Sequence, residues 1–146
     1  MKDAVKDIGD PQESTSKFGP LMDSAASERV KCMINRAKTE SELVFGGGRI
    51  GEEGCFLEPT VFLNPNQDAV IYKKEVLCPG SVIKTFDTEE EVIELANDTE
   101  YGLMAGVFTR DINRAMRVAG KIESGVVRIN CVSVVSRIPS ECPFQS

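Results

Sequence analysis

The sequence predicts an α/β protein made of βαβ units with parallel strands. Three short apolar segments, 81–86, 103–108 and 126–129, alternate with two amphipathic helical segments. The resulting order of strand, helix, strand, helix, strand is typical of parallel sheets with right-handed crossovers. The chain has 146 residues, of which 41% are hydrophobic and 27% charged. Such a chain is long and apolar enough to fold around a buried core.

The first half of the chain begins with a polar segment and continues with a helix. Residues 1–20 are polar and rich in Gly and Pro, so we expect a lead-in before the folded part, residues 21–146. Residues 22–38 place apolar side chains at steps of three and four, which predicts a helix. Either Asp23 or Ser24 is suited to cap its start. The apolar positions are Ala26, Val30, Met33, Ile34 and Ala37.

Two extended segments, 43–45 and 56–63, follow the helix. Pro59 cannot donate a hydrogen bond to a sheet, so it indicates a sheet edge or a break in the second segment. The segment 46–51 between them, GGGRIG, has the spacing G-x-G-x-x-G of a dinucleotide-binding loop. That motif must open a helix, whereas here it runs into two glutamates and another extended segment. A tight glycine turn between strands is therefore the favoured interpretation.

The two helices of the second half have clear start signals. Thr88 followed by Glu91 matches a capping box, and the acidic run 89–91 suits the positive end of a helix. This position explains the acidic run without a metal or an acid–base role. Asp111 caps the next helix, which we expect to end at Gly125. The apolar positions of the two helices are Val92, Ile93, Ala96, Ile112, Ala115, Met116, Ala119 and Ile122.

Charge and composition exclude several classes of function. The net charge is −6, and an acidic chain of this kind disfavours nucleic acid as a partner. The sequence contains no histidine, which excludes Ser-His-Asp and Cys-His catalysis and histidine-ligated metals. No apolar stretch approaches the length of a membrane span, and the N-terminus has no apolar core of a signal peptide.

The five cysteines include no CxxC pair, and their number is odd. Free thiols in a reducing compartment are the simplest interpretation, so we expect a cytoplasmic protein. A reactive thiol needs a neighbouring base, a cation or a helix start to lower its pKa. Cys131 follows a predicted strand, where α/β sites are often found, but no activating residue is near it in the sequence.

Four stretches then stand out together: GDPQESTSKFGPL, FLEPTVF, the long run KKEVLCPGSVIKTFDTEEEVIELANDTEYGLMAGVFTRDINRAMRVAGKIESGVVRINC, and the late pair PF. In order and spacing they resemble the C-terminal part of the catalytic domain of NAD(P)-dependent aldehyde dehydrogenases. The resemblance extends from Gly9 to Phe144, and its most specific part is the run 86–108. It implies that the chain is a partial catalytic domain, without the dinucleotide-binding domain and without the strand that completes the oligomerisation sheet.

The resemblance also implies an activity. The family oxidises aldehydes to carboxylic acids: a cysteine thiolate attacks the aldehyde, a hydride passes to NAD or NADP, and a glutamate activates water to hydrolyse the thioester. The family's nucleophile and general base precede the GDP…FGPL stretch, so they would lie before Met1, and none of the five cysteines aligns with the nucleophile. We therefore expect no catalytic residue here and no activity of the chain alone.

The resemblance assigns cofactor and substrate positions to a few residues. Residues 74–79 align with the family pattern Glu-Glu-(Ile/Val)-Phe-Gly-Pro and match it at Glu75 and Pro79. In the family the second Glu binds the nicotinamide ribose and the Phe packs near the nicotinamide. Glu75 matches this Glu, Leu77 replaces the Phe, and Cys78 replaces the Gly. A side chain at Cys78 would strain the turn if that residue takes a positive φ. Phe144 matches a residue of the substrate pocket.

Two departures and two alternatives complete this interpretation. Arg128 stands where the family often has Trp, in a strand that we expect to be buried, and an unpaired arginine there would be costly. Cys131 occupies the Asn-Cys position after that strand. One alternative to a partial enzyme is a non-catalytic partner that associates with full-length subunits of the family, through faces that missing domains would otherwise cover. The other is a working enzyme with a new site at Cys131.

Overall fold

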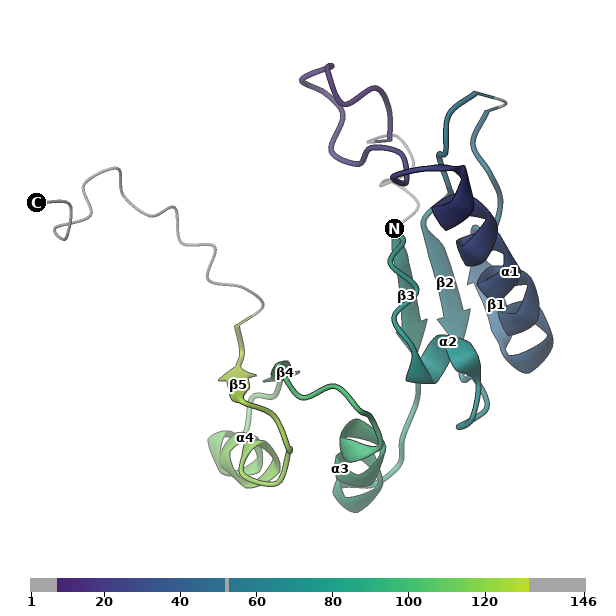
Figure 1. Cartoon of the computed structure of the whole chain (residues 1–146). Helices are drawn as coiled ribbons and strands as arrows, with labels where there is room; N and C mark the ends of the chain where they lie inside the picture. The colour runs from purple at the N-terminus through teal and green to yellow at the C-terminus, as the bar shows by residue number, and fades with distance from the viewer. Residues whose placement is uncertain (1–7, 52, 132–146) are drawn as a thin grey trace, which may run out of the picture. The chain divides into compact units, whose positions relative to one another are not determined.

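The computed structural model describes residues 8–51 and 53–131, which form two compact units (Figure 1). We call them the N-terminal unit, which ends at Thr85, and the C-terminal unit, which begins at Phe86. The mixture of helices and parallel strands confirms the α/β class. None of the helices in the described ranges is long and apolar enough to cross a membrane. In chain order the elements are α1 Ser24–Glu40, β1 Glu42–Phe45, β2 Thr60–Leu63, α2 Val70–Lys73, β3 Gly80–Ile83, α3 Glu89–Asn97, β4 Met104–Val107, α4 Ile112–Ala119 and β5 Val126–Ile129.

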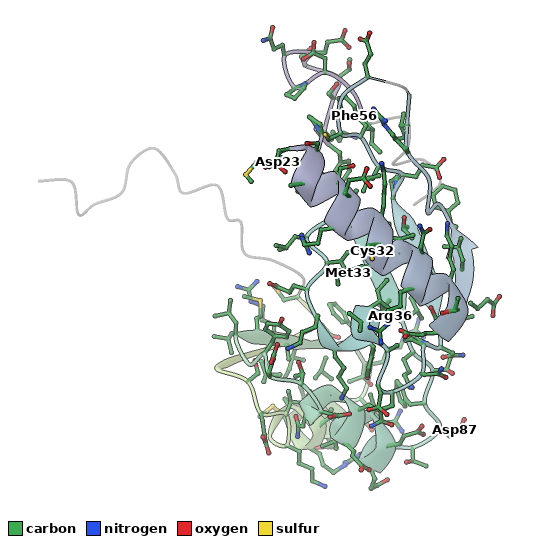
Figure 2. All side chains as sticks on the ribbon, turned by 45° about the vertical axis from the view of Figure 1, so that its right-hand side comes forward. Asp23, Cys32, Met33, Arg36, Phe56 and Asp87 are labelled. Carbon is green, nitrogen blue, oxygen red and sulfur yellow. The ribbon has the colours of Figure 1, made fainter. Side chains whose placement is uncertain are left out.

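Helix α1 confirms the prediction for 22–38 and settles its cap. The side chain of Asp23 accepts a hydrogen bond from the backbone N–H of Ala26 at 2.7 Å, so Asp23 is the N-cap. In Figure 2 Asp23 lies at the start of the helix, and Cys32, Met33 and Arg36 follow along it. The buried face consists of Ser27, Val30, Ile34 and Ala37.

The core of the N-terminal unit lies where α1 packs against the sheet β1-β2-β3 and against α2. Phe62 of β2 is 1% exposed, and Val30 of α1 is completely buried. Burying a side chain of this size contributes about 1.5–3 kcal/mol. The other core members are Ile34, Ala37, Leu57, Ala69 and Ile71.

Strand β2 is the central strand of this sheet. It pairs antiparallel with β1 and parallel with β3. The second extended segment is broken after Pro59, because the ladder begins at Thr60; of the two interpretations of this proline, the break is confirmed. Helix α2, which the sequence analysis did not predict, lies in the connection from β2 to β3.

The glycine-rich segment leads into a paired arm and not into a tight turn. The N–H of Glu58 donates to the carbonyl of Gly48, and that of Ile50 to the carbonyl of Phe56. Gly46 has a φ of +75° and passes directly over the backbone of Pro59. No helix follows these glycines within the described part of the arm, which removes the structural requirement for a dinucleotide loop.

The C-terminal unit contains one of the two predicted βαβ units. Strands β4 and β5 pair in parallel, with α4 between them in the chain. Both predicted caps are confirmed: Thr88 accepts from the N–H of Glu91, and Asp111 accepts from Asn113 and Arg114. Helix α4 is shorter than expected, because it ends at Ala119 and not at Gly125.

The segments 81–86 and 103–108 of the other predicted βαβ unit contribute strands to two different compact units, β3 to the first and β4 to the second. Their pairing with each other therefore stays a prediction. Strand β3 ends at Ile83. The side-chain oxygen of Asn64 accepts hydrogen bonds from the N–H and the hydroxyl of Thr85, so this N–H is not available to extend the ladder.

Candidate functional site

A cavity of about 340 Å³ lies beside the loop 74–80, which joins α2 to β3. Its walls come from α1, α2, β2 and β3, so the rigid core of the N-terminal unit supports it. The lining combines apolar and polar side chains, as small-molecule sites do. The lining residues are Ile34, Thr60, Phe62, Ile71, Lys74, Glu75, Val76, Leu77, Cys78, Gly80, Ser81 and Val82.

Both residues that the sequence analysis assigned to a cofactor line this cavity. Glu75 and Leu77 are exposed, and 68% of the Leu77 surface is accessible. A carboxylate at such a position can accept hydrogen bonds from hydroxyl groups, and a leucine offers an apolar surface to a flat ring. The two side chains therefore fit the ribose and nicotinamide end of a dinucleotide, and their contact with it stays a prediction.

The backbone strain of the loop falls on a different residue from the one expected. Leu77 has a φ of +58°, in the left-handed region, whereas Cys78 is not among the residues with a positive φ. For a residue with a Cβ, this conformation costs about 1–2 kcal/mol. Replacement of a family glycine by Cys78 therefore does not strain the turn, and the conformational cost lies at Leu77.

Short hydrogen bonds hold the end of the loop against the sheet. The backbone N–H of Thr60 donates to the carbonyl of Pro79 at 2.9 Å, and the N–H of Gly80 donates to the carbonyl of Cys78 at 2.7 Å. Thr60 itself is 1% exposed, and its hydroxyl donates to the carbonyl of Glu58 and accepts from the N–H of Gly47. Thr60 at the start of β2 thus fixes the loop through Pro79 and the glycine-rich segment 46–51 through Gly47.

The thiol of Cys78 is half-buried beside the cavity. Burial raises its pKa, and the positive charge of Arg29 opposes this effect only in part. A raised pKa keeps the thiol protonated near neutral pH, which is the opposite of what a nucleophile needs. Cys78 lines the cavity, and its burial disfavours the thiolate form.

Arg29 is the site residue that the sequence analysis missed. Its Nη2 donates to the carbonyl oxygen of Val76 at 3.1 Å, and its Nη1 lies 3.5 Å from the sulfur of Met33. The first of these bonds joins α1 to the loop across 47 residues. No local sequence pattern indicates such a contact.

The remaining predicted residues lie elsewhere. Phe144 is outside the described residues. Cys131 belongs to the C-terminal unit and is half-buried, two residues after the end of β5. Arg128 is half-buried rather than fully buried, and it pairs in register with Gly106.

The acidic run at the start of α3 has the structural role expected of it. Glu91 completes the capping box by accepting from the N–H of Asp87. Glu89 accepts from Arg114 and Arg117 of α4, and the hydrogen bond from Arg117 is the largest cause of its lowered pKa. The described residues contain no cluster of side chains suited to hold a metal ion.

Comparison with known proteins gives consistent matches. The model of the family described as "Aldehyde dehydrogenase family" matches residues 1–145. The chain is 39% identical over 138 residues to aldehyde dehydrogenase 1A1 of Mesocricetus auratus, which covers 94% of this chain and 27% of that protein. It is similar to the structure of an aldehyde dehydrogenase variant from Bacillus cereus, with a TM-score of 0.85, 38% identity and coverage of 91% of this chain and 28% of that one. It is also similar to betaine aldehyde dehydrogenase from Staphylococcus aureus in complex with NAD+, with a TM-score of 0.82, 33% identity and coverage of 90% and 27%.

Proposed function

This chain belongs to the aldehyde dehydrogenase family, and from this we propose that it is part of an enzyme that oxidises aldehydes to carboxylic acids with NAD+ or NADP+. The chain spans about 27% of the length of the curated relative described above. The observation that carries the proposal is the cavity whose rim holds Glu75 and Leu77 on one loop.

The loop residues would hold the reactive end of the cofactor. The Glu75 carboxylate would accept hydrogen bonds from the ribose hydroxyls, and charge-assisted bonds of this kind are among the stronger ones. Leu77 would cover one side of the nicotinamide and exclude water from it. The dinucleotide, when bound, accepts the hydride of the aldehyde.

We expect no turnover by the 146 residues alone. The family's nucleophilic cysteine and general-base glutamate have no counterpart among the aligned residues of this sequence, and the burial of Cys78 disfavours its thiolate. Purified chain mixed with propanal and NAD+ should form no NADH. Formation of NADH would contradict this part of the proposal.

Association with longer subunits of the same family would supply the missing groups. The C-terminal unit exposes several large apolar side chains, which supports this, since exposed apolar surface is available for association. Co-purification with a full-length family member would test it. The apolar side chains of this unit that are at least half exposed are Phe86, Leu103, Met104, Phe108, Ile112 and Met116.

The thiols that the structure describes are free, which supports a reducing, cytoplasmic location.

Titration with NAD+ tests the cofactor role directly. In two-dimensional NMR spectra of the full chain, NAD+ should shift the amide signals of residues 75–78. Glu75→Gln should weaken binding about tenfold, the loss expected for one charge-assisted hydrogen bond. Glu42→Gln is the matched control, because Glu42 is an exposed carboxylate of the same unit that does not line the cavity. An absence of shifts in the loop at millimolar NAD+ would refute the proposed contact.

A further inference from the structure

We propose that Arg29 is a positioning residue that fixes the loop 74–80 in the conformation in which Glu75 and Leu77 line the cavity. The part of this inference that concerns cofactor binding rests on the proposed function. The part that concerns the loop itself does not.

The guanidinium of Arg29 reaches the loop at its middle. Its hydrogen bond ends on the carbonyl of Val76, the residue between the two cofactor candidates, at 3.1 Å. Arg29 projects from a well-anchored part of α1, because its neighbour Val30 is completely buried and Ser27 is 4% exposed. The planar fork of an arginine loses little freedom for each bond that it makes. Arg29 thereby holds the backbone of the loop at a fixed distance from α1.

Val76 and Cys78 pack against the core of the unit, whereas Leu77 between them is exposed and gains little from burial. The two ends of the loop are held by backbone hydrogen bonds, from Lys74 to the carbonyl of Val70 and from Thr60 to the carbonyl of Pro79. Between them, Leu77 has a φ of +58° and is 68% exposed. A strained residue persists only where the surrounding structure holds it.

The side chain of Leu77 also borders a second hollow of the surface. A groove of about 450 Å³ lies at the start of α1, and Leu77 lines both this groove and the cavity. Arg29 itself lines the groove. Loss of its bond to Val76 would release the backbone next to Leu77, and the side chain could turn from the cavity toward the groove. The other lining residues of the groove are Leu21, Met22, Asp23, Ala25 and Ala26.

Three variants separate this role from helix stability. Arg29→Ala removes the bond at an exposed position and keeps a strong helix former. Arg36→Ala is the matched control, because Arg36 is an arginine of the same helix whose Nε binds Glu40 of that helix at 2.7 Å. Arg29→Lys keeps the charge and a donor, so it should rescue part of the effect.

The first readout needs no ligand. The order of residues 75–78, measured by the 15N–1H heteronuclear NOE of their amides, should fall in Arg29→Ala, because the loop loses its bond to a charged donor. Arg36→Ala should leave the order of the loop unchanged, and Arg29→Lys should lie between. An unchanged NOE in Arg29→Ala, with the α1 signals intact, would overturn the proposal. If Arg29→Ala loses the α1 signals as well, Arg29→Lys decides: wild-type order in the loop supports positioning by the charged donor, and reduced order with α1 intact refutes it.

The second readout distinguishes this inference from the proposed function. The affinity for NAD+ should fall about tenfold in Arg29→Ala and remain at the wild-type value in Arg36→Ala. If the wild-type chain binds no NAD+ but the loop loosens in Arg29→Ala, the cofactor role fails and the positioning role stands. If NAD+ binds equally to both chains, Arg29 does not position the cofactor residues.

Discussion

Replacement of Gly46 by alanine should destabilise the N-terminal unit far more than the same change at Gly51. Both glycines have a positive φ, +75° at Gly46 and +68° at Gly51. They differ in their surroundings. A Cβ on Gly46 would overlap the carbonyl oxygen of Pro59 and would lie 2.9 Å from its carbonyl carbon and 3.1 Å from the Cα of Thr60, whereas a Cβ on Gly51 would meet nothing within 4 Å.

The expected magnitudes follow from these contacts. The left-handed backbone costs an alanine about 1–2 kcal/mol at either position. At Gly46 the neighbours are backbone atoms that cannot rotate away, and such overpacking adds about 1–3 kcal/mol. We therefore expect a loss of about 2–5 kcal/mol for Gly46→Ala and about 1–2 kcal/mol for Gly51→Ala.

Urea unfolding with a probe in the N-terminal unit would measure both losses. The sequence contains no tryptophan and two tyrosines, Tyr72 and Tyr101. In a Tyr101→Phe background the fluorescence of Tyr72, which lies in α2, reports on the N-terminal unit alone. Equal losses for the two glycine variants would refute the role assigned to the close approach at Pro59.

Three further predictions concern other parts of the molecule. Thr60→Val should lower the free energy of unfolding by about 1–3 kcal/mol, because it leaves the N–H of Gly47 without its acceptor. Thr60→Ser keeps the hydroxyl and should cost about 1 kcal/mol for the lost methyl group. Urea unfolding measures both. The pKa of Glu89 is lowered in the folded chain, so its stabilising effect is present above the ordinary pKa of a glutamate and is lost as the pH falls through the lowered value. Glu89→Gln should therefore make the stability of the C-terminal unit less dependent on pH in the acid range, as the fluorescence of Tyr101 in a Tyr72→Phe background would show. The rate of Cys78 alkylation should reach half of its maximum at a pH above the pKa of an ordinary thiol, because burial raises the pKa of this thiol. Arg29→Ala should raise this pH further, because it removes the positive charge that opposes the effect. Peptide mapping by mass spectrometry measures both.

Each of these has a clear contrary result. Unchanged stability in Thr60→Val would show that the hydroxyl contributes nothing. If the stability of Glu89→Gln falls as steeply with acid pH as that of the wild type, Glu89 does not cause this pH dependence. Alkylation of Cys78 at a lower pH than that of the exposed Cys32 would contradict the effect of burial.

The sequence was most informative where structure is determined locally. Thr88 with Glu91, and Asp111, each lie within three residues of the N–H groups that they cap, so a short pattern was enough to locate the helix starts. The four-residue helix α2 has no side-chain cap and too few residues for a periodicity, and it was missed. The pairing of strands depends on contacts that are distant in sequence, and the sequence analysis did not predict that β3 pairs with β2.

The candidate site divides in the same way. Glu75 and Leu77 were found because a family pattern of six residues aligns with the chain. The positive φ of Leu77 was not found, since leucine gives no signal for that conformation, which glycine and asparagine usually adopt. The bond from Arg29 to Val76 spans 47 residues and depends on the docking of α1, which no short motif encodes.

The short crossovers of both sheets affect how the chain folds. Thr60 pairs with Gly80, a separation of 20 residues, and Met104 pairs with Val126, a separation of 22 residues. The entropy of loop closure rises only slowly with length, and low contact order accelerates folding. Each parallel pair can therefore close soon after its second strand leaves the ribosome, before the rest of the polypeptide has been synthesised.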